Sequence, residues 1–366
     1  MPELWRMEGL FTMLKELTEL PGASGSEKPV RDYIAKTLSG YVDDLKIDRL
    51  GNLIAFKKGS AGDGRRVALF AHMDEVGLIV TGADEDGYLK IDSLGGVDPH
   101  VLLAKRVKVG REEMTGIIGY KPIHLQSQEE REKRVKLSEL RVDIGAKDKD
   151  EALSKAPLGT PIHFDSETHF IGLGDVLPKG GALPPRGRLV GKAFDDRVGC
   201  LALMAVLMGD LELPYDLYGV FTILEEEGLR GAKPAAWEVE PDIAVVLEST
   251  VADDLPREED LSPTTRLGGG PAVTIMDRRT ITDPKLAAYF MRIAGDNGIP
   301  LQVKQPGVGG TDGRVVQVAK RGARVGILAV PSRYIHSPSG VIELSDLVNM
   351  LKLLEKSLPG ITTVLE

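Results

Sequence analysis

The 366-residue sequence has a single cysteine, Cys200, which excludes a disulfide framework. Cys200 lies in the apolar stretch 198–204, whose helical pattern predicts a buried, inert thiol rather than a nucleophile. No apolar run approaches the roughly 18 residues that a membrane span needs, and the N-terminus lacks the apolar segment of a signal peptide. These absences predict a soluble cytoplasmic protein in a reducing compartment, without a membrane partner.

Positive charge is scarcer than negative charge. The chain has 46 Lys and Arg residues against 55 Asp and Glu residues, which gives a formal net charge of −9. Because no basic stripe is present to neutralise phosphates, the composition argues against binding of nucleic acid. The main run of mixed charge, residues 128–136, alternates in sign and is typical of a solvated loop or helix face. The apolar content of 42% suffices for a substantial core.

Two types of sequence pattern alternate along the chain. Residues 1–75 and 178–366 combine helical periodicity with short buried strands, and a helix over residues 27–38 is expected to have Ser26 as its N-cap. In residues 76–177, short β-type runs are separated by Gly and Asp turns, and helical periodicity is scarce. The sequence therefore predicts an α/β fold with a mixed, largely parallel sheet flanked by helices, interrupted by an inserted small β-barrel or sandwich.

Residues that bind metals or transfer protons stand where predicted strands end or a helix begins. They are His72, Asp195, Glu225, Glu226, Glu248 and His336. Ligands of open, largely parallel sheets gather at the carboxyl ends of the strands. Two histidines and several carboxylates that converge there suit a pair of divalent cations.

The first informative motif is His72-Met73-Asp74, directly after a buried run. An Asp two residues later projects to the same side of an extended chain, where its carboxylate can accept the other ring N–H and fix the tautomer. Taken alone, the motif fits a strand-end histidine with a solvated Asp better than a metal ligand. The same spacing at His163 and Asp165 lacks an adjoining buried strand, and we assign that pair no role.

Two carboxylate runs admit two interpretations each. Asp195 and Asp196 precede an apolar helix and fit either an N-cap with its first turn or a bridge between two cations. The run Glu225-Glu226-Glu227 fits an exposed acidic turn, or a cleft in which a nearby cation offsets the mutual repulsion. Adjacent residues at an extended end point in different directions, so one can bind metal while its neighbour acts as a general base.

The last two motifs are weaker. Pro338 stiffens the turn that contains His336, where an isolated histidine is more often structural than a ligand. The glycine-rich stretch 307–313 is not followed by the Gly-Lys-Ser/Thr of a phosphate loop. Close backbone packing near the cleft is the preferred interpretation of that stretch.

Five segments together resemble the signature motifs of the tetrahedral (TET) aminopeptidases, two-metal peptidases of the glutamyl and deblocking type. In chain order they are residues 71–77, 191–199, 225–232, 309–312 and 333–338. The resemblance extends from about Pro21 to the C-terminal helix. It implies a metallo-aminopeptidase that removes N-terminal residues from peptides, uses two Zn²⁺ or Co²⁺ ions per subunit, and assembles from dimers into a hollow tetrahedral dodecamer.

Carried over by position, the resemblance implies a ligand set for two metals. Asp195 would bridge both ions. His72 and Glu248 would complete one site. At the position of Glu248, the best-known members of the family commonly have Asp. Glu226 and His336 would complete the other site.

The resemblance also implies roles beside the metals. Glu225 would be the general base that takes a proton from the attacking water and returns it to the departing nitrogen. Asp74 would orient His72, and Asp196 would follow through a cis peptide bond. Residues 76–177 would form the dimerisation domain.

Two other functions remain as alternatives. Proteins of this appearance are sometimes labelled endoglucanases, and a glycosidase needs a carboxylate pair but usually no metal. A metal-binding assembly protein without catalysis is the third reading of the motifs. One departure, Gly340 where the family often has an acidic residue, is expected to alter the loop beside the site. None of the motifs predicts which N-terminal residue is preferred.

Overall fold

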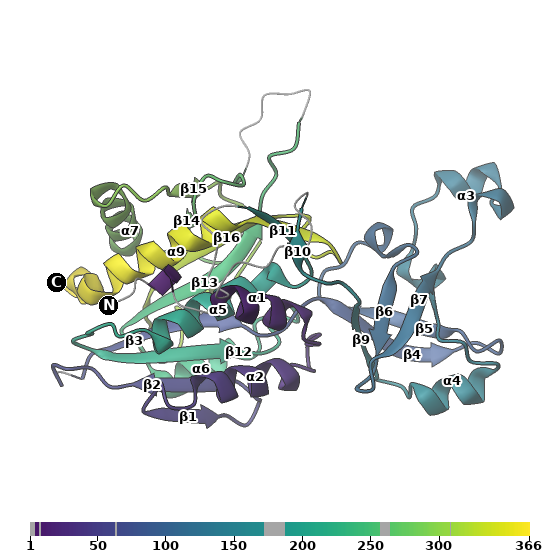
Figure 1. Cartoon of the computed structure of the whole chain (residues 1–366), viewed down its shortest axis with the longest axis horizontal. Helices are drawn as coiled ribbons and strands as arrows, with labels where there is room; N and C mark the ends of the chain where they lie inside the picture. The colour runs from purple at the N-terminus through teal and green to yellow at the C-terminus, as the bar shows by residue number, and fades with distance from the viewer. Residues whose placement is uncertain (1–3, 7–8, 63, 172–186, 257–263, 308) are drawn as a thin grey trace.

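Two units make up the chain, a large sheet flanked by helices and a closed barrel (Figure 1). The computed structural model describes residues 4–6, 9–62, 64–171, 187–256, 264–307 and 309–366. The predicted α/β fold with an inserted β unit is confirmed. The expected boundary between residues 177 and 178 lies outside the described residues, so the bounds of the insertion stay a prediction.

The large sheet is parallel at its centre and antiparallel towards its edges. Its strands are β1 (Asp44–Ile47), β2 (Leu53–Lys57), β3 (Arg66–His72), β10 (His169–Phe170), β11 (Arg188–Gly191), β12 (Asp216–Thr222), β13 (Ile243–Val251), β14 (Ala272–Thr274), β15 (Gln302–Lys304), β16 (Arg324–Arg333) and β17 (Gly340–Glu343). They follow the order β1-β2-β12-β3-β13-β16-β17-β11-β10, with β14 and β15 beside β16. Because β12, β3, β13 and β16 are mutually parallel, their carboxyl ends meet at one edge.

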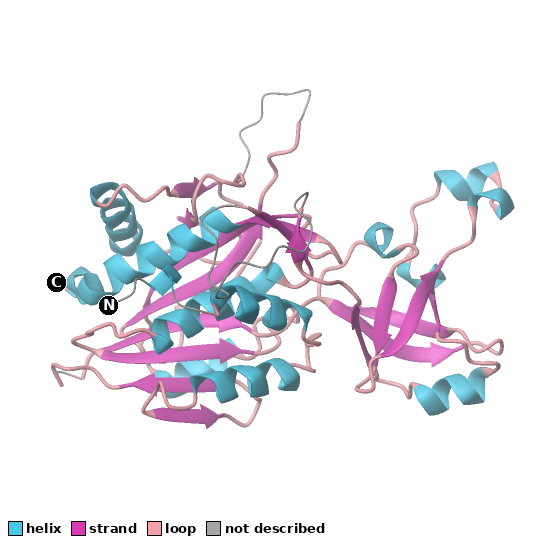
Figure 2. Ribbon diagram, viewed as in Figure 1, coloured by secondary structure: helices cyan, strands magenta, loops and turns pink. Residues whose placement is uncertain are grey.

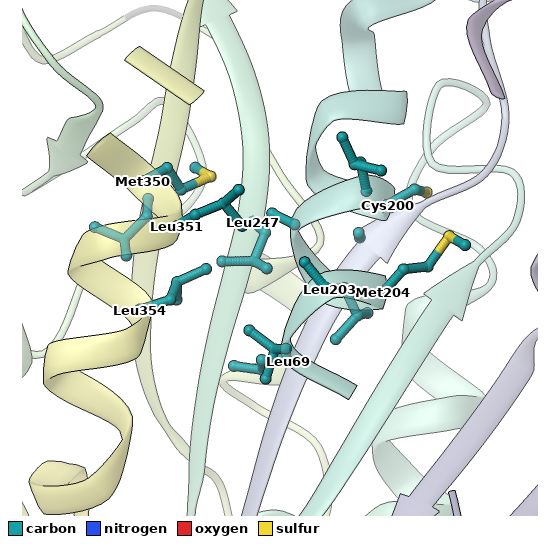
Figure 3. Close-up of a cluster of buried hydrophobic side chains, with 14 of the residues drawn as sticks. Leu69, Cys200, Leu203, Met204, Leu247, Met350, Leu351 and Leu354 are labelled. Atoms are coloured by element: carbon teal, nitrogen blue, oxygen red, sulfur yellow. The ribbon is translucent and has the colours of Figure 1, made fainter. Parts of the chain in front are cut away.

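Helices cover both faces of this sheet (Figure 2). They are α1 (Leu10–Glu19), α2 (Lys28–Leu38), α5 (Phe194–Met208), α6 (Ala232–Val239), α7 (Pro284–Asp296), α8 (Gly313–Val316) and α9 (Leu344–Ser357). Side chains alternate along each strand, so Leu69 packs with the α5 and α9 layer while Phe70 packs with α6 and α8. Figure 3 shows Leu69 and Leu247 of the sheet in one cluster with Leu203 of α5 and Leu351 of α9.

From Val198 onwards, helix α5 is apolar on all sides, which is expected of a helix enclosed by other elements. Cys200 is fully buried in it, as predicted, and burial raises the pKa of its thiol. The prediction for the start of α2 is wrong. Glu27 occupies the N-cap position, because Ser26 is held in the preceding turn, where its N–H donates to the Ala23 carbonyl.

The barrel closes through the strand order β4-β5-β8-β7-β6-β9. Its strands are β4 (Gly77–Ala83), β5 (Leu89–Leu94), β6 (Arg106–Val109), β7 (Met114–Gly119), β8 (Arg141–Asp143) and β9 (Pro161–Phe164). A separate apolar cluster, including Leu78, Val107 and Ile162, fills its interior. Helices α3 (Gln128–Glu132) and α4 (Lys149–Lys155) lie outside it, and the mixed-charge run contributes the exposed α3. No helix in the described part of the chain is long and apolar enough to cross a membrane.

Candidate metal centre

The parallel strands bring the predicted residues to one edge of the sheet. His72 is the last residue of β3, and Glu225 and Glu226 follow the end of β12. The expectation that Glu248 follows its strand is wrong. The strand β13 continues to Val251, because it stays paired with β16 along its whole length. Glu248 therefore projects from within β13, and the backbone hydrogen bonds between β13 and β16 fix its position.

Asp195 reaches the cluster from the entrance of α5. Asp195 and Asp196 have non-helical backbone angles, and the peptide bond between them is cis, as the resemblance implied. One carboxylate oxygen of Asp196 accepts the His72 N–H at 3.2 Å, and the other accepts the Gly199 N–H at 3.0 Å. Asp196 thereby joins the first turn of α5 to the end of β3.

The two oxygens of Asp195 face two different histidines. His72 Nε2 lies 3.2 Å from Asp195 Oδ1 and 3.0 Å from Glu248 Oε1. His336 Nε2 lies 3.3 Å from Asp195 Oδ2 and 3.1 Å from Glu226 Oε1. In each of these two trios, the ligand atoms lie within 4.8 Å of one another. A carboxylate shared in this way has the arrangement of a bridge between two cations.

Glu225 stands apart from these two trios. A third trio of His72, Glu225 and Glu226 also has its ligand atoms within 4.8 Å of one another. However, the Nε2 atom of His72 already has Glu248 and Asp195 at 3.0 and 3.2 Å. The buried side chain of Glu225 forms no hydrogen bond with another residue in the described part of the chain, so Glu225 faces the cluster without a histidine partner of its own.

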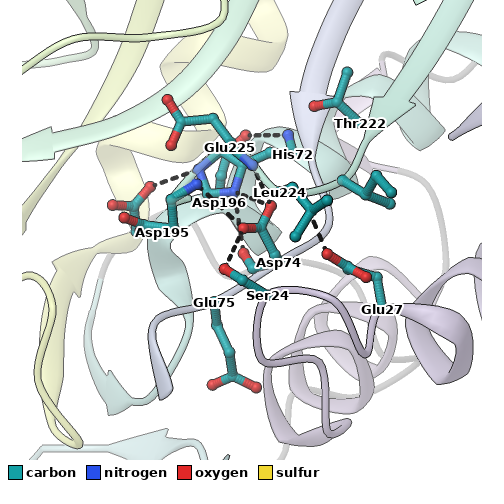
Figure 4. Close-up of polar contacts among 12 residues, drawn as sticks. Ser24, Glu27, His72, Asp74, Glu75, Asp195, Asp196, Thr222, Leu224 and Glu225 are labelled. Atoms are coloured by element: carbon teal, nitrogen blue, oxygen red, sulfur yellow. Dashed lines mark hydrogen bonds and ion pairs between the residues drawn. The ribbon is translucent and has the colours of Figure 1, made fainter. Parts of the chain in front are cut away.

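Asp74 is a buried junction beneath the cluster (Figure 4). Its carboxylate accepts the Ser24 hydroxyl at 2.6 Å, the Glu225 N–H at 3.0 Å and the Glu226 N–H at 3.1 Å. His72 Nδ1 lies 3.0 Å from the Asp74 carbonyl oxygen and 3.4 Å from the nearer carboxylate oxygen. A proton on Nδ1 that is donated to this carbonyl leaves the Nε2 lone pair free for a metal. Asp74 thus orients His72 mainly through its backbone.

His336 is held from the barrel side of the molecule. Its Nδ1 atom lies 2.9 Å from the carbonyl oxygen of Gly96, in the segment that follows β5. The neighbouring Gly95 N–H donates to Glu227 Oε1 at 2.7 Å. The three consecutive glutamates therefore have separate environments, and the third one binds the backbone of the inserted unit. His336 has a positive φ of 58° and a side chain that is one-third exposed, 33%.

The cluster has an excess of carboxylates, and its electrostatics show the consequence. Burial raises the pKa of Glu225 and Glu226, and it raises the pKa of Glu248 to about 8. Burial acts in the same direction on Asp195, but hydrogen bonds with both histidines outweigh it and lower its pKa. Burial lowers the pKa of His336, yet Asp195 and Glu226 overcome this and raise it to about 11. Divalent cations would supply the missing positive charge, and the His and carboxylate donors suit Zn²⁺ or Co²⁺.

The structure adds residues that sequence reasoning left without a role. Asp312 is buried beside β12, and its Oδ2 accepts the Thr222 hydroxyl at 2.6 Å. Its Oδ1 has no partner among the described residues. The motif at residues 309–312 drew attention to Asp312, but it did not predict the contact with Thr222. Lys304 is also buried near the cluster. The sequence did not point to Lys304, because it is a single lysine at the end of a short strand. His163, with the same spacing as His72, lies in β9 and belongs to none of the three trios.

Gly340 lies at the start of β17, where it pairs with Gly191 of β11. A Cβ atom at this position would lie 3.4 Å from both the Gly191 carbonyl oxygen and the Phe194 ring. The position is therefore part of the sheet, and an added Cβ would be in van der Waals contact with the strand next to the entrance of α5.

Comparisons with known proteins find relatives along nearly the whole chain. The family model described as M42 glutamyl aminopeptidase matches residues 51–353, and a model described as AMPT matches residues 11–32. A putative aminopeptidase of Acetivibrio thermocellus is 34% identical, over 96% of this chain and 99% of the relative. The lysyl aminopeptidase of Pyrococcus furiosus is 32% identical, over 94% and 95%. The glutamyl aminopeptidase of Lactococcus lactis is 28% identical, over 97% of both chains.

Solved structures share the whole architecture. A TET aminopeptidase from a marine sediment Thaumarchaeota archaeon has a TM-score of 0.88 and 34% identity, covering 97% of this chain and 98% of its own. The TET1 peptidase of Pyrococcus horikoshii, which can assemble into a tetrahedron or a large octahedral shell, has a TM-score of 0.81 and 32% identity, covering 96% and 99%. An endoglucanase structure from Thermotoga maritima has a TM-score of 0.76 and 35% identity, covering 96% and 98%.

The family model spans most of the chain, and relatives above 30% identity cover nearly all of it. The candidate site lies at the carboxyl ends of the parallel strands within the matched region. This chain belongs to the M42 glutamyl aminopeptidase family and is a hydrolase that acts on peptide bonds.

Proposed function

We propose that the chain is a metal-dependent aminopeptidase that removes N-terminal residues from peptides, with two divalent cations and Glu225 as the general base. The observation that carries this proposal is the position of Asp195, whose two oxygens face His72 and His336 separately. A lone metal site would not need a carboxylate shared by two histidine-containing trios.

Each cation would have its own histidine and its own glutamate. His72 and Glu248 would hold one ion, and Glu226 and His336 would hold the other, with Asp195 shared. The longer Glu in place of Asp still reaches, because Glu248 Oε1 lies 3.0 Å from His72 Nε2. When bound, such a pair polarises a scissile carbonyl, makes a water molecule more acidic and stabilises developing negative charge.

Glu225 would move the proton. Its backbone N–H is fixed by Asp74 at 3.0 Å, and its side chain lies in the wall of the open pocket next to Glu226. A carboxylate held beside the site of attack accepts a proton from the water and donates it to the departing peptide nitrogen. The donation to nitrogen is required because an amide anion is too basic to leave unprotonated.

A metal-depletion experiment tests the proposal. Protein stripped with EDTA should be inactive on a panel of aminoacyl chromogenic substrates, and added Zn²⁺ or Co²⁺ should restore turnover as two ions bind per subunit. Activity on a β-glucan that survives chelation would instead favour the endoglucanase reading. Full occupancy by metal without turnover of any aminoacyl substrate would favour the non-catalytic assembly protein.

We further propose that residues 76–177 form a dimerisation domain and that dimers assemble into a dodecamer. The TET1 relative can assemble into a tetrahedron or a large octahedral shell, and a second solved structure of TET1 contains a dodecamer. Large apolar side chains are exposed on this unit, among them Ile117, Ile123, Leu125 and Leu158. Exposed apolar groups of this size favour association. Light scattering of the full chain should give a mass near twelve subunits, and a monomer would contradict the proposal.

A further inference from the structure

Side chains, rather than the sheet, hold the backbone that carries Glu225. Strand β12 and its pairing with β3 both end at Thr222. The next four backbone N–H groups all donate to side chains from the first 74 residues of the chain. Their acceptors are Asn52 Oδ1 for Ile223 at 3.0 Å, Glu27 Oε1 for Leu224 at 3.1 Å, and the two oxygens of Asp74 for Glu225 at 3.0 Å and Glu226 at 3.1 Å. Because buried N–H groups need acceptors, these three side chains decide the path of the chain beyond the sheet.

The carboxylate of Glu225 depends on this backbone for its direction. It forms no hydrogen bond with any residue that the structure describes, so no contact of its own corrects an error in the backbone. The preceding residue, Leu224, has a φ of 54°, which a residue with a Cβ atom rarely adopts. Such a conformation persists only where the surroundings hold it. The hydrogen bond to the N–H of Leu224 therefore contributes to the direction in which the Glu225 side chain leaves the chain.

Glu27 is well placed to provide this hydrogen bond. It is the N-cap residue of α2, and its side chain is buried. The oxygen that accepts the N–H of Leu224 also accepts that of Gly25 at 2.7 Å, so the carboxylate is fixed from its own side as well. Figure 4 shows Glu27 pointing towards Leu224. Glu27 belongs to none of the three trios of potential metal ligands. It therefore reaches the site only through the backbone of its neighbour.

Asn52 holds the two ends of the same turn independently of Glu27. While its Oδ1 accepts the Ile223 N–H, its Nδ2 donates to the Gly231 carbonyl at 2.9 Å. The Gly231 N–H in turn donates to the Ile223 carbonyl at 3.1 Å. An added Cβ on Gly231 would lie 2.4 Å from Asn52 Oδ1, so the two ends fit closely. Loss of the Glu27 acceptor should therefore displace Leu224 without opening the turn.

We propose that Glu27 is a positioning residue for the general base, and that it aims the carboxylate of Glu225 by fixing the backbone N–H of Leu224. This inference rests on the proposed function of Glu225. Proton transfer requires the base to lie within hydrogen-bond reach of the attacking water, so a misplaced base slows the chemical step more than it weakens substrate binding. Glu226 is held by Asp74 rather than by Glu27, so both metals should still bind.

Steady-state kinetics of the metal-loaded full chain test the proposal on the best aminoacyl p-nitroanilide of the panel. Glu27→Met removes the acceptor at nearly equal volume. It should lower kcat about 10- to 100-fold and leave KM within about twofold, with two metals still bound per subunit. Glu27→Gln can keep an oxygen in the place of Oε1 and should retain kcat within about threefold.

Asp346→Leu is the matched control for loss of a buried acceptor. Asp346 is buried at the start of α9 and accepts the N–H groups of Gly268 and Gly270, both at 2.8 Å. This variant should also lose stability in urea unfolding, because two buried N–H groups lose their acceptor. Its kcat should stay within about twofold of the wild-type value, since distant and independent sites do not couple.

A double variant shows whether Glu27 acts through the base. In the Glu225→Gln background no base is left to aim, so adding Glu27→Met should lower the residual kcat by less than about twofold. The same fold loss as in the wild-type background would mean that Glu27 acts independently of Glu225, and it would overturn the proposal.

The remaining outcomes are equally decisive. An unchanged kcat in Glu27→Met would overturn the inference, while the aminopeptidase function would stand. Loss of a metal, or a Glu27→Gln variant as slow as Glu27→Met, would also overturn it, as would an equal loss of kcat in Asp346→Leu. If Glu27→Met does not fold, Glu27→Asp takes its place with a carboxylate one methylene shorter, and a wild-type kcat there would contradict the proposal. Hydrolysis of no aminoacyl substrate by the wild-type protein would overturn the proposed function and this inference with it.

Discussion

The two halves of the candidate metal centre have the same donor types and very different surroundings. His72 is 1% exposed, ends a central strand, and has its Nδ1 atom beside the Asp74 carbonyl. His336 is 33% exposed, lies in a turn after β16, and has its Nδ1 atom beside the Gly96 carbonyl. One half is fixed by the sheet itself, and the other half depends on a segment from the inserted unit.

This difference shows which elements hold each half of the site in place. The His72 half is surrounded by packed strands, so its donors lose little freedom when a cation binds. The His336 half joins a loop to the segment after β5, so its geometry requires the two units to be correctly placed. We expect the His72 half to bind its metal more tightly and the His336 half to exchange its metal more readily.

The largest effect is expected from Glu225→Gln, because Glu225 belongs to neither half of the candidate metal centre. The variant should lose about 10²- to 10⁴-fold in kcat and still hold two metals per subunit, since a general base has been removed and no ligand. Steady-state rates and elemental analysis measure the two quantities. Glu227→Gln is the control, because its amide oxygen can still accept the Gly95 N–H. Persistent activity would remove Glu225 from the role of base, and loss of a metal would make it a ligand.

Removing either histidine should separate the halves. His72→Ala and His336→Ala should each lose one metal per subunit. Both variants should destabilise the metal-free protein, because each histidine pairs with two carboxylates of the cluster. His72→Ala should cost more, about 1–3 kcal/mol, because it also leaves a gap in a fully buried place, whereas His336 is one-third exposed. Urea unfolding of the metal-free variants measures the difference, and equal losses of stability would break the comparison.

Asp74→Asn tests the junction that the halves share. An amide places an N–H₂ group where the carboxylate now accepts the backbone N–H groups of Glu225 and Glu226. Metal affinity should fall by about 10- to 100-fold, and at both positions. The carboxylate holds the backbone of Glu226 directly, and its bonds to Ser24 and Glu225 keep in place the Asp74 carbonyl that faces His72. Titration calorimetry on stripped protein measures this. Asp98→Asn, at an exposed pair with His100, is the control. A loss confined to one position would show that Asp74 serves only that half.

The smallest effect is expected from Gly95→Ala, which acts on the His336 half alone. The added Cβ would lie 2.8 Å from Val76 Cγ1 and 3.2 Å from Glu226 Cβ, so Glu226 must shift. The affinity of the weaker metal should fall several-fold, while that of the tighter metal stays the same. Gly145→Ala is a matched control, since it has a similar positive φ of 70° and open space around it. An equal effect of both variants would attribute the change to backbone strain.

Much of the fold and site could be predicted because local patterns encode them. Strand-end residues such as His72 and Glu226 are visible as polar residues after apolar runs, and the parallel topology brings them together. The continuation of β13 through Glu248 could not be predicted, because pairing with β16 decides it rather than local composition. The contact of His336 with Gly96 joins residues 240 positions apart. Lys304 was missed for the same reason, since only the tertiary fold shows what surrounds it.

The one thiol of the chain offers a native reporter of motion. Cys200 Sγ donates to the His72 carbonyl at 3.1 Å and is enclosed by the α5 layer. A thiol reagent can reach it only when α5 separates from β3, which is the packing that holds the first histidine in place. The rate at which the reagent modifies Cys200 therefore measures how often α5 separates from β3, and no probe has to be introduced. Added metal should slow that rate by the factor with which it favours the closed state.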